Sequence, residues 1–239
     1  MRHILTTTLA LISMIAFGQD SLSQVPKGAW KSQEPTGSAS TLIVADNYMV
    51  IASYSVGNKY FERTEGGPFT MSGDQMTYTP EFNSADTAKI GIPIVFTVTV
   101  KDDILTLKYE EAMVWMRVDD ATNVPMAGAW HITERANGAQ GELVKIHQEG
   151  TRKTLKLLSA TRFQWFAIDP AVKGFYATGG GTYTAKNGKY TEKIQFFSKD
   201  NNRVGSSLSF DFKLDNGRWD HSGKSSEGKP IHEIWEKIK

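Results

Sequence analysis

The sequence predicts an all-β protein built as two tandem, up-and-down antiparallel β-barrels. Three observations lead to this prediction: Gly-Ala-Trp occurs at residues 28–30 and again at 128–130, similar segments recur at a nearly constant offset, and hairpin signals separate short alternating stretches. The chain has 239 residues, of which 40% are hydrophobic and 22% are charged. It is therefore long enough and apolar enough for two modest globular domains.

The first segment is typical of an export signal. Arg2 provides a basic start, residues 4–17 are apolar with interspersed threonine and serine, and the run ends in Ala-Phe-Gly. We expect a signal peptide over residues 1–18 and export of the chain, either to the periplasm or as a secreted protein. The apolar run is shorter than the ~20 residues that a membrane-spanning helix needs, and no later segment is long enough, so no membrane span is expected.

Charge and cysteine content narrow the range of partners. The absence of cysteine excludes disulfides and suits a bacterial periplasm or exterior. Arg2 is one of 27 basic residues against 26 acidic ones, so a mature chain without the signal carries equal numbers of each. This balance argues against nucleic acid or an anionic membrane as a partner.

The common catalytic and cofactor motifs are missing. The sequence holds no Gly-x-Ser-x-Gly, no His-Glu-x-x-His, no phosphate-binding loop and no calcium loop, so no cofactor is expected. The glycines at 179–181 precede a predicted strand and not a helix, and they are therefore interpreted as a turn.

The repeat divides the chain into residues 26–120 and 126–239, each predicted to form one barrel. A polar stretch containing Pro125 separates them and is too short to hold them far apart. Most of the second copy follows the first at an offset of 114 residues. The aligned pairs are TLIVAD (41–46) with TLKLLS (154–159), residues 61–84 with 175–198, VTVKDDILTL (98–107) with FKLDNGRWDH (212–221), and VWMR (114–117) with IWEK (234–237).

Hairpin signals predict which residues of the second copy share a face. Two Asn-Gly pairs lie between alternating stretches and indicate two-residue turns. The pair at 187–188 places Tyr183 opposite Glu192, and the later pair places Phe212 opposite His221. Opposed residues lie on the same face, and the apolar neighbours indicate that this face points inward.

The Gly-Ala-Trp start, the meander of short strands and a basic residue on the last strand resemble the lipocalin-like, or calycin, barrels. In lipocalins that basic side chain packs over the tryptophan of the first strand and closes the base of the barrel. The resemblance therefore implies that Arg117 covers Trp30 and that Lys237, in place of the usual arginine, covers Trp130. It extends from about residue 26 onward, and the tandem form is similar to a group of exported lipocalin-like bacterial proteins of unknown function.

Five polar side chains of the second copy are expected to point into its barrel. Trp165 is expected to line the barrel beside them. The same inward face is expected to run on to Phe196. A buried carboxylate costs several kcal/mol unless it is paired or hydrated, so these groups need partners, water or a ligand. The predicted ligand-binding residues are Tyr183, Tyr190, Glu192, His221, Glu233 and Trp165, and the counterparts of the first five in the first copy are Phe69, Met76, Tyr78, Leu107 and Met113.

Because most of those counterparts are apolar, the first copy is interpreted as a packed support and the second as the working cavity. The leading hypothesis is a non-catalytic module that binds a small, partly apolar ligand in the second barrel. In a purely structural network, Arg162 or backbone groups at strand ends would satisfy Glu192 and Glu233.

Three further hypotheses remain open. Glu192 and Glu233 suit the acid and base of a hydrolase or isomerase that acts on a small sugar-like substrate. Together with His221 they suit a divalent metal site. A structural protein of the cell envelope would have both barrels filled, so the volume of the second lumen separates this hypothesis from the others.

Overall fold

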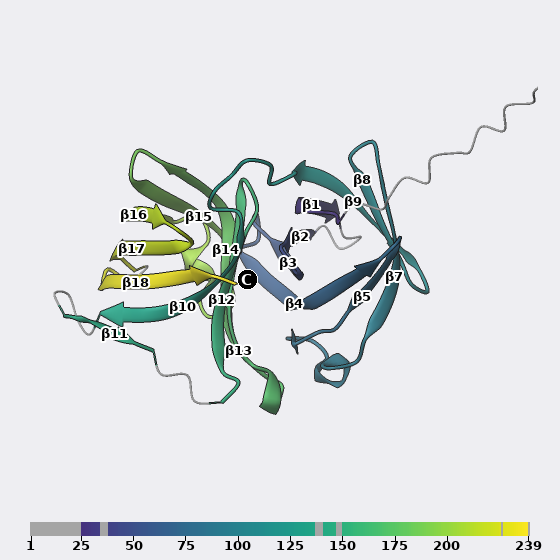
Figure 1. Ribbon diagram of the computed structural model, residues 1–239, viewed down its shortest axis with the longest axis horizontal. Coiled ribbons are helices and arrows are strands. Elements are labelled where there is room, and N and C mark those ends of the chain that lie inside the picture. Colours follow the sequence, from purple (N-terminus) through teal and green to yellow (C-terminus); the bar gives the residue numbers. More distant parts are fainter. Residues whose placement is uncertain (1–24, 34–37, 137–140, 147–149, 226, 239) are drawn as a thin grey trace, which may run out of the picture.

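The computed structural model describes residues 25–33, 38–136, 141–146, 150–225 and 227–238, and the predicted signal peptide lies outside them. The described residues form two closed, eight-stranded antiparallel barrels that lie side by side (Figure 1). The predicted all-β, two-barrel fold is confirmed.

The first barrel is an up-and-down meander. Its strands pair in chain order, and the last strand pairs with the first, which closes the barrel. A short strand, β6 (Phe82–Asn83), pairs with β4, and a 3₁₀ turn, η1 (Thr87–Lys89), follows it. The eight barrel strands are β1 (Gly28–Gln33), β2 (Ala39–Ala45), β3 (Tyr48–Ser55), β4 (Tyr60–Ser72), β5 (Gln75–Tyr78), β7 (Ile94–Lys101), β8 (Ile104–Lys108) and β9 (Ala112–Asp119).

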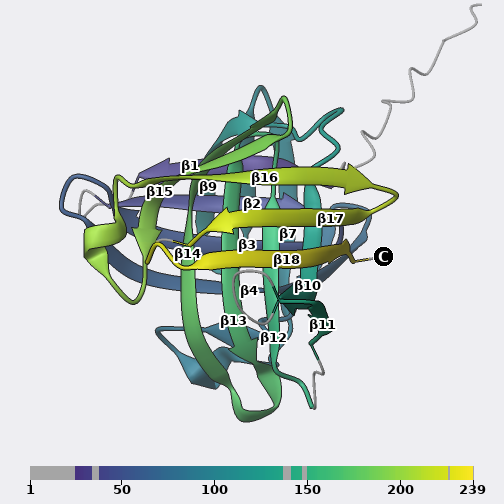
Figure 2. The ribbon, with the colours of Figure 1, turned by 90° about the vertical axis from the view of Figure 1, so that its left-hand side faces the viewer.

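The second barrel repeats this order. The accessory strand β11 (Leu143–Lys145) pairs with β10, and η2 (Pro170–Val172) and η3 (Asn201–Arg203) lie between strands. In Figure 2, β16–β18 lie in front and cross β12–β14 of the opposite side. The eight barrel strands are β10 (Gly128–Ala136), β12 (Lys153–Leu158), β13 (Arg162–Asp169), β14 (Gly174–Lys186), β15 (Lys189–Phe197), β16 (Ser207–Asp215), β17 (Arg218–Lys224) and β18 (Pro230–Lys237).

The Asn-Gly turns have the backbone conformation that the sequence predicts. Asn187 and Gly188 both have positive φ angles, of 52° and 72°, as a two-residue primed hairpin turn requires. Tyr183 lies opposite Glu192, as expected, and the later turn likewise brings Phe212 opposite His221.

A cation over a tryptophan closes the base of each barrel. The guanidinium carbon of Arg117 lies 4.1 Å from the ring centre of Trp30, and the ammonium of Lys237 lies 5.7 Å from that of Trp130. Each indole also donates to a backbone oxygen four residues earlier, at 2.8 Å and 2.9 Å. Both contacts that the lipocalin resemblance implied are present.

A β-bulge changes the facing of the residues beyond Ile194. The register of β14 and β15 shifts between Gly180 and Gly181, so one residue of β15 has no partner. As a result Phe196 faces the first barrel and packs on Tyr54 with ring centroids 4.6 Å apart, and its predicted position inside the lumen was wrong. The predicted turn at 179–181 was also wrong, because these glycines lie within β14.

Gly181 allows the bulge to form. Its φ is +157°, and a Cβ atom there would lie 2.1 Å from the backbone oxygen of Lys193. At the equivalent place in the first barrel, a Cβ atom on Gly67 would lie 2.0 Å from the backbone oxygen of Thr79. The repeated glycine pair therefore marks the same close approach of two strands in each copy.

The two barrels pack against each other through apolar strand faces. Residues of β2 and β3 that point away from the first lumen meet residues of β12 and β13 that point away from the second. Strands buried on both faces read as continuous apolar runs, which explains the stretches TLIVA and YMVIA. The buried residues of this contact are Ile43, Ala45, Tyr48, Val50, Phe82, Ala129, Leu155, Leu157, Phe166 and Ile168.

The contact between the barrels is nearly symmetric. Phe82 of the first barrel packs on Phe175 of the second, with ring centroids 6.1 Å apart. Phe196, the counterpart of Phe82, packs on Phe61, the counterpart of Phe175, at the same distance. Reciprocal contacts of this kind are typical of a two-fold interface between identical subunits, which here joins two halves of one chain.

Hydrogen bonds border the apolar contact. The carboxylate of Asp119, at the end of β9, accepts hydrogen bonds from Ser159, Ala160 and Thr161 in the β12–β13 turn. In the β2–β3 turn, Asp46 accepts from the backbone N–H of Ala129 at 2.9 Å. Side chains as well as the linker therefore hold the barrels together.

Phe166→Ala tests this packing. Phe166 is fully buried between Tyr48 and Phe82, so its truncation is expected to lower the free energy of unfolding by about 3–5 kcal/mol. Urea unfolding followed by tryptophan fluorescence measures the loss. Val172→Ala, at a residue that is 68% exposed, is the control and is expected to change stability by less than about 0.5 kcal/mol. A cost for Phe166→Ala below that of the control would contradict the packing described.

Candidate functional site

The lumen of the second barrel contains a cluster of buried polar side chains. Trp165 lies beside them, half-buried, with its ring edge-on to Phe197 at a centroid distance of 5.6 Å. The five predicted polar residues, each at most 7% exposed, are Tyr183, Tyr190, Glu192, His221 and Glu233.

Lys156 supplies a positive charge that the sequence analysis did not single out. It lies on β12, and its ammonium donates to Oε1 of Glu192 at 2.9 Å. The two side chains are 5% and 6% exposed, so the ion pair is buried. In such a pair the cost of desolvation offsets much of the attraction, but each charge depends on the other for its partner.

A register error of one residue concealed Lys156. The alignment of TLIVAD with TLKLLS set Lys156 against Ile43, whose side chain faces the other barrel. In the structure, Trp30 lies opposite Leu42 on the neighbouring strand. Trp130 lies opposite Lys156. Lys156 therefore takes the inward place of Leu42, and the predicted alignment of this strand was wrong because a one-residue slip reverses the facing of every side chain.

Three side chains surround the carboxylate of Glu233. Arg135 donates to Oε1 at 2.7 Å, and the indole N–H of Trp235 donates to Oε2 at 3.2 Å. Nδ1 of His221 lies 3.7 Å from Oε2. Arg135 is another residue that the sequence analysis missed, because its strand carries no turn signal that fixes the facing of residue 135.

Arg162 does not pair with Glu192 or Glu233, contrary to the hypothesis of a purely structural network. Its guanidinium donates to the side-chain oxygen of Gln195 at 2.8 Å, and Tyr54 of the first barrel donates to the same oxygen at 3.2 Å. Arg162 therefore belongs to the contact between the barrels. Glu192 and Glu233 are paired with Lys156 and Arg135 instead.

Burial and charge set the protonation of the cluster. Burial is the main cause that lowers the pKa of His221, and the positive charge of Lys156 acts in the same direction, so the imidazole is neutral at pH 7. Burial alone would raise the pKa of Glu233. Contact with His221 and the charges of Arg135 and Lys156 outweigh it and lower that pKa to about 2.

In the second lumen, three of the described residues carry buried polar atoms with no hydrogen-bond partner. These atoms are Oη of Tyr190, Nε1 of Trp219 and both ring nitrogens of His221. Tyr78 and Trp115 of the first barrel, and Arg162 at the contact between the barrels, each carry one such atom as well. The rings of Tyr190, Trp219 and His221 contact one another, with centroid distances between 4.9 Å and 5.7 Å. Water or a polar group of a ligand can supply the donor or acceptor that buried atoms of this kind lack.

Tyr183 differs from the other predicted residues. Its hydroxyl donates to the backbone oxygen of Ser159 at 2.6 Å. Burial raises its pKa, and the nearby charge of Asp119 raises it further, so the phenol stays protonated. Its hydrogen-bonding capacity is used within the protein, and it contributes mainly its ring to the lumen.

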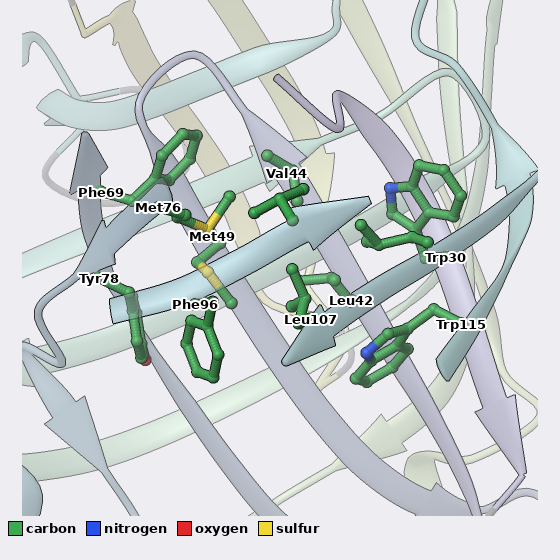
Figure 3. Close-up of a cluster of buried hydrophobic side chains, with 12 residues drawn as sticks. Trp30, Leu42, Val44, Met49, Phe69, Met76, Tyr78, Phe96, Leu107 and Trp115 are labelled. Carbon is green, nitrogen blue, oxygen red and sulfur yellow. The ribbon is translucent and has the colours of Figure 1, made fainter. Parts of the chain in front are cut away.

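The first barrel fills the corresponding layer with apolar side chains. Figure 3 shows Leu42, Met76 and Leu107 in its interior, where the second barrel has Lys156, Tyr190 and His221. Glu192 corresponds to Tyr78, which is buried, whereas Glu233 corresponds to Met113, which is 36% exposed. The contrast predicted between the two lumens is present in this layer.

The first barrel has a polar group of its own near β6. The carboxylate of Glu65 accepts from Asn83 at 2.8 Å, and burial raises its pKa. A hollow of about 120 Å³ lies beside it, bordered also by Arg63 and Lys89. The first copy therefore also contains a polar group, beside the mostly apolar counterparts named above.

A larger hollow, of about 440 Å³, lies where the two barrels meet the linker. Two of its charged side chains have partners, because Lys237 donates to the backbone oxygen of Ala127 at 2.7 Å and Asp46 accepts from Ala129. The second lumen instead holds the unpartnered atoms of Tyr190, Trp219 and His221.

The geometry gives no support to the metal and acid–base hypotheses. Among the residues that the structure describes, no group of three or more His, Asp or Glu side chains lies close enough to hold a metal ion. Acid–base chemistry on two carboxyls needs one with a raised pKa. Here Glu192 is paired with Lys156, and the pKa of Glu233 is lowered.

One comparison with known proteins bears on the second barrel. Residues 125–239 match the family model described as a domain of unknown function (DUF4488). The matched segment begins in the linker and includes every strand of the second barrel. No curated protein matches the chain. Within the described part of the chain, no helix combines the length and apolar character needed to cross a membrane.

The buried ion pair predicts an asymmetric response to mutation. Lys156→Met removes the partner of Glu192 and is expected to lower the free energy of unfolding by about 3–5 kcal/mol. Lys156→Met/Glu192→Leu removes both charges and is expected to be much closer to the wild type. Urea denaturation of the three proteins measures the difference. A double variant as unstable as the single one would contradict the dependence of one charge on the other.

The lowered pKa values predict loss of stability in acid. Both groups bind fewer protons in the folded state, so stability falls as the pH falls. The contribution of His221 is lost below its ordinary pKa of 6.5, and that of Glu233 between 4.5 and about 2. His221→Leu is expected to remove the first loss, seen as a flat urea midpoint between pH 7 and pH 5. His131→Gln is the control, and a His221→Leu variant with the wild-type slope would refute the assignment.

Proposed function

We propose that the chain is an exported, lipocalin-like protein whose second barrel binds a small, partly apolar molecule without transforming it. The observation that carries the proposal is the set of unpartnered polar atoms on Tyr190, Trp219 and His221, gathered inside a closed barrel. Apolar sites with a few convergent polar groups are the usual form of small-molecule sites.

The aromatic side chains supply the apolar part of the site. Tyr190 and Trp219 are fully buried, and Trp165 and Phe197 pack beside the same core cluster. The polar atoms favour a ligand with at least one hydrogen-bond acceptor, because the indole N–H can only donate. With the charges paired as Lys156–Glu192 and Arg135–Glu233, a neutral ligand fits better than a charged one.

The lipocalin-like part of the proposal is supported by the closed meander and by the cation over a tryptophan at the base of each barrel. Export is supported by the apolar, signal-like segment at residues 4–17. The two carboxylates are paired with Lys156 and Arg135, which favours binding over acid–base catalysis.

Native mass spectrometry of the protein purified from its source cells tests the binding function. The matched variant is Tyr190→Phe/His221→Phe, which keeps two rings in the lumen and removes three of the four unpartnered atoms on Tyr190, Trp219 and His221. We expect one small molecule per chain in the wild type and its loss, or at least a tenfold weaker retention, in the variant. One lost hydrogen bond of about 1.4 kcal/mol gives that factor.

A wild type that carries no small molecule, together with a variant more stable than the wild type, would refute the proposal. That result would mean that the polar atoms are merely unsatisfied, since replacing such atoms by apolar ones of the same shape is then stabilising.

A further inference from the structure

The ammonium of Lys156 lies inside a box of aromatic rings. Its distances to the ring centres are 5.0 Å for Trp219, 5.0 Å for Trp235, 5.4 Å for Tyr190 and 5.8 Å for Phe163. All four lie within the roughly 6 Å at which a cation is attracted to the face of a ring. The four rings come from β13, β15, β17 and β18, so strands far apart in the sequence build the box together.

Glu192 supplies the anionic part of the box. Its Oε1 accepts from the Lys156 ammonium at 2.9 Å, and the four rings are between 0% and 3% exposed. Aromatic boxes are the usual means by which proteins recognise quaternary ammonium ligands, and the same attraction acts on any cation at the face of a ring. A carboxylate that accepts an N–H hydrogen bond favours a primary ammonium, because a quaternary one has no proton to donate.

The first barrel has no such box at the equivalent positions. The lysine, the carboxylate and three of the four rings are all replaced, and Trp115 alone keeps the aromatic character of its counterpart Trp235. The lysine, the carboxylate and three of the rings therefore differ together between the two copies. The first-barrel residues are Leu42 for Lys156, Tyr78 for Glu192, Met49 for Phe163, Met76 for Tyr190 and Leu105 for Trp219.

We propose that this box is a binding site for a primary alkylammonium group and that Lys156 is its resident occupant. An external alkylammonium ion and the Lys156 side chain compete for the same place. The intact chain therefore binds such ions weakly, and removal of the Lys156 side chain makes the site available. The proposal depends on the surroundings of Lys156 and stands independently of the function proposed above.

The test is rescue of Lys156→Ala by n-propylammonium chloride. That ion has the four non-hydrogen atoms that the substitution removes. We expect the thermal unfolding midpoint of Lys156→Ala to rise by on the order of 5 °C in an excess of n-propylammonium. The wild-type midpoint is expected to stay where sodium chloride of the same ionic strength leaves it.

The duplication provides the matched control. Leu42→Ala makes a comparable truncation at the equivalent place of the first barrel, where no aromatic box and no carboxylate are present. Its midpoint is expected not to respond to n-propylammonium. n-Propanol and sodium propionate, of the same length without the positive charge, are expected not to rescue Lys156→Ala. Lys156→Met fills the space without a charge and is expected to bind no amine.

A Lys156→Ala variant that responds to n-propylammonium no more than Leu42→Ala would overturn the proposal, as would equal rescue by n-propanol. If the variant does not stay folded alone, the readout is its refolding yield with n-propylammonium against sodium chloride, and equal yields would also overturn it. Rescue of Lys156→Ala, together with an empty wild type and a Tyr190→Phe/His221→Phe variant more stable than the wild type, would uphold this site and refute the proposed function alone.

Discussion

The outward faces of β2 and β3 are buried against those of β12 and β13, and this contact constrains the rest of the structure. A closed barrel ordinarily presents the outside of every strand to solvent. Here four strands are buried on both sides, so their outward residues must be apolar or hydrogen-bonded within the contact, whatever the lumen contains. The lumen faces are free of that constraint, and it is there that the two copies differ most, as Leu42 and Lys156 show.

The sequence predicted the fold well because its local signals are strong. Asn187-Gly188 fixes the hairpin register by its positive φ angles, and the pairing of Tyr183 with Glu192 follows from it. The alternation of polar and apolar residues no longer predicts which way a side chain faces where a bulge interrupts the pairing of β14 and β15. The bulge at Gly180 and Gly181 turns Phe196 outward, and a bulge leaves no mark in the alternation of polar and apolar residues before it.

Part of the candidate site was predicted because hairpin turns determine which way its side chains face. His221 and Glu233 lie on strands whose facing the turns determine, and both are buried in the lumen. Lys156 lies in TLKLLS, where both neighbours are apolar because they face the other barrel. A lysine between two leucines is predicted to face outward unless the contact between the barrels is known. That contact depends on residues more than a hundred positions apart.

Gln164 shows what covalent linkage adds to a nearly symmetric pair of barrels. Its side-chain nitrogen donates to Thr64 at 2.8 Å and to Thr178 at 3.0 Å, and these threonines hold equivalent places in the two barrels. The counterpart of Gln164 is Val50, which cannot make either bond. Two copies of the second barrel would confront glutamine with glutamine, and two copies of the first would leave both threonines without that donor. The contact therefore fits two unlike barrels, which disfavours the pairing of like barrels from two chains.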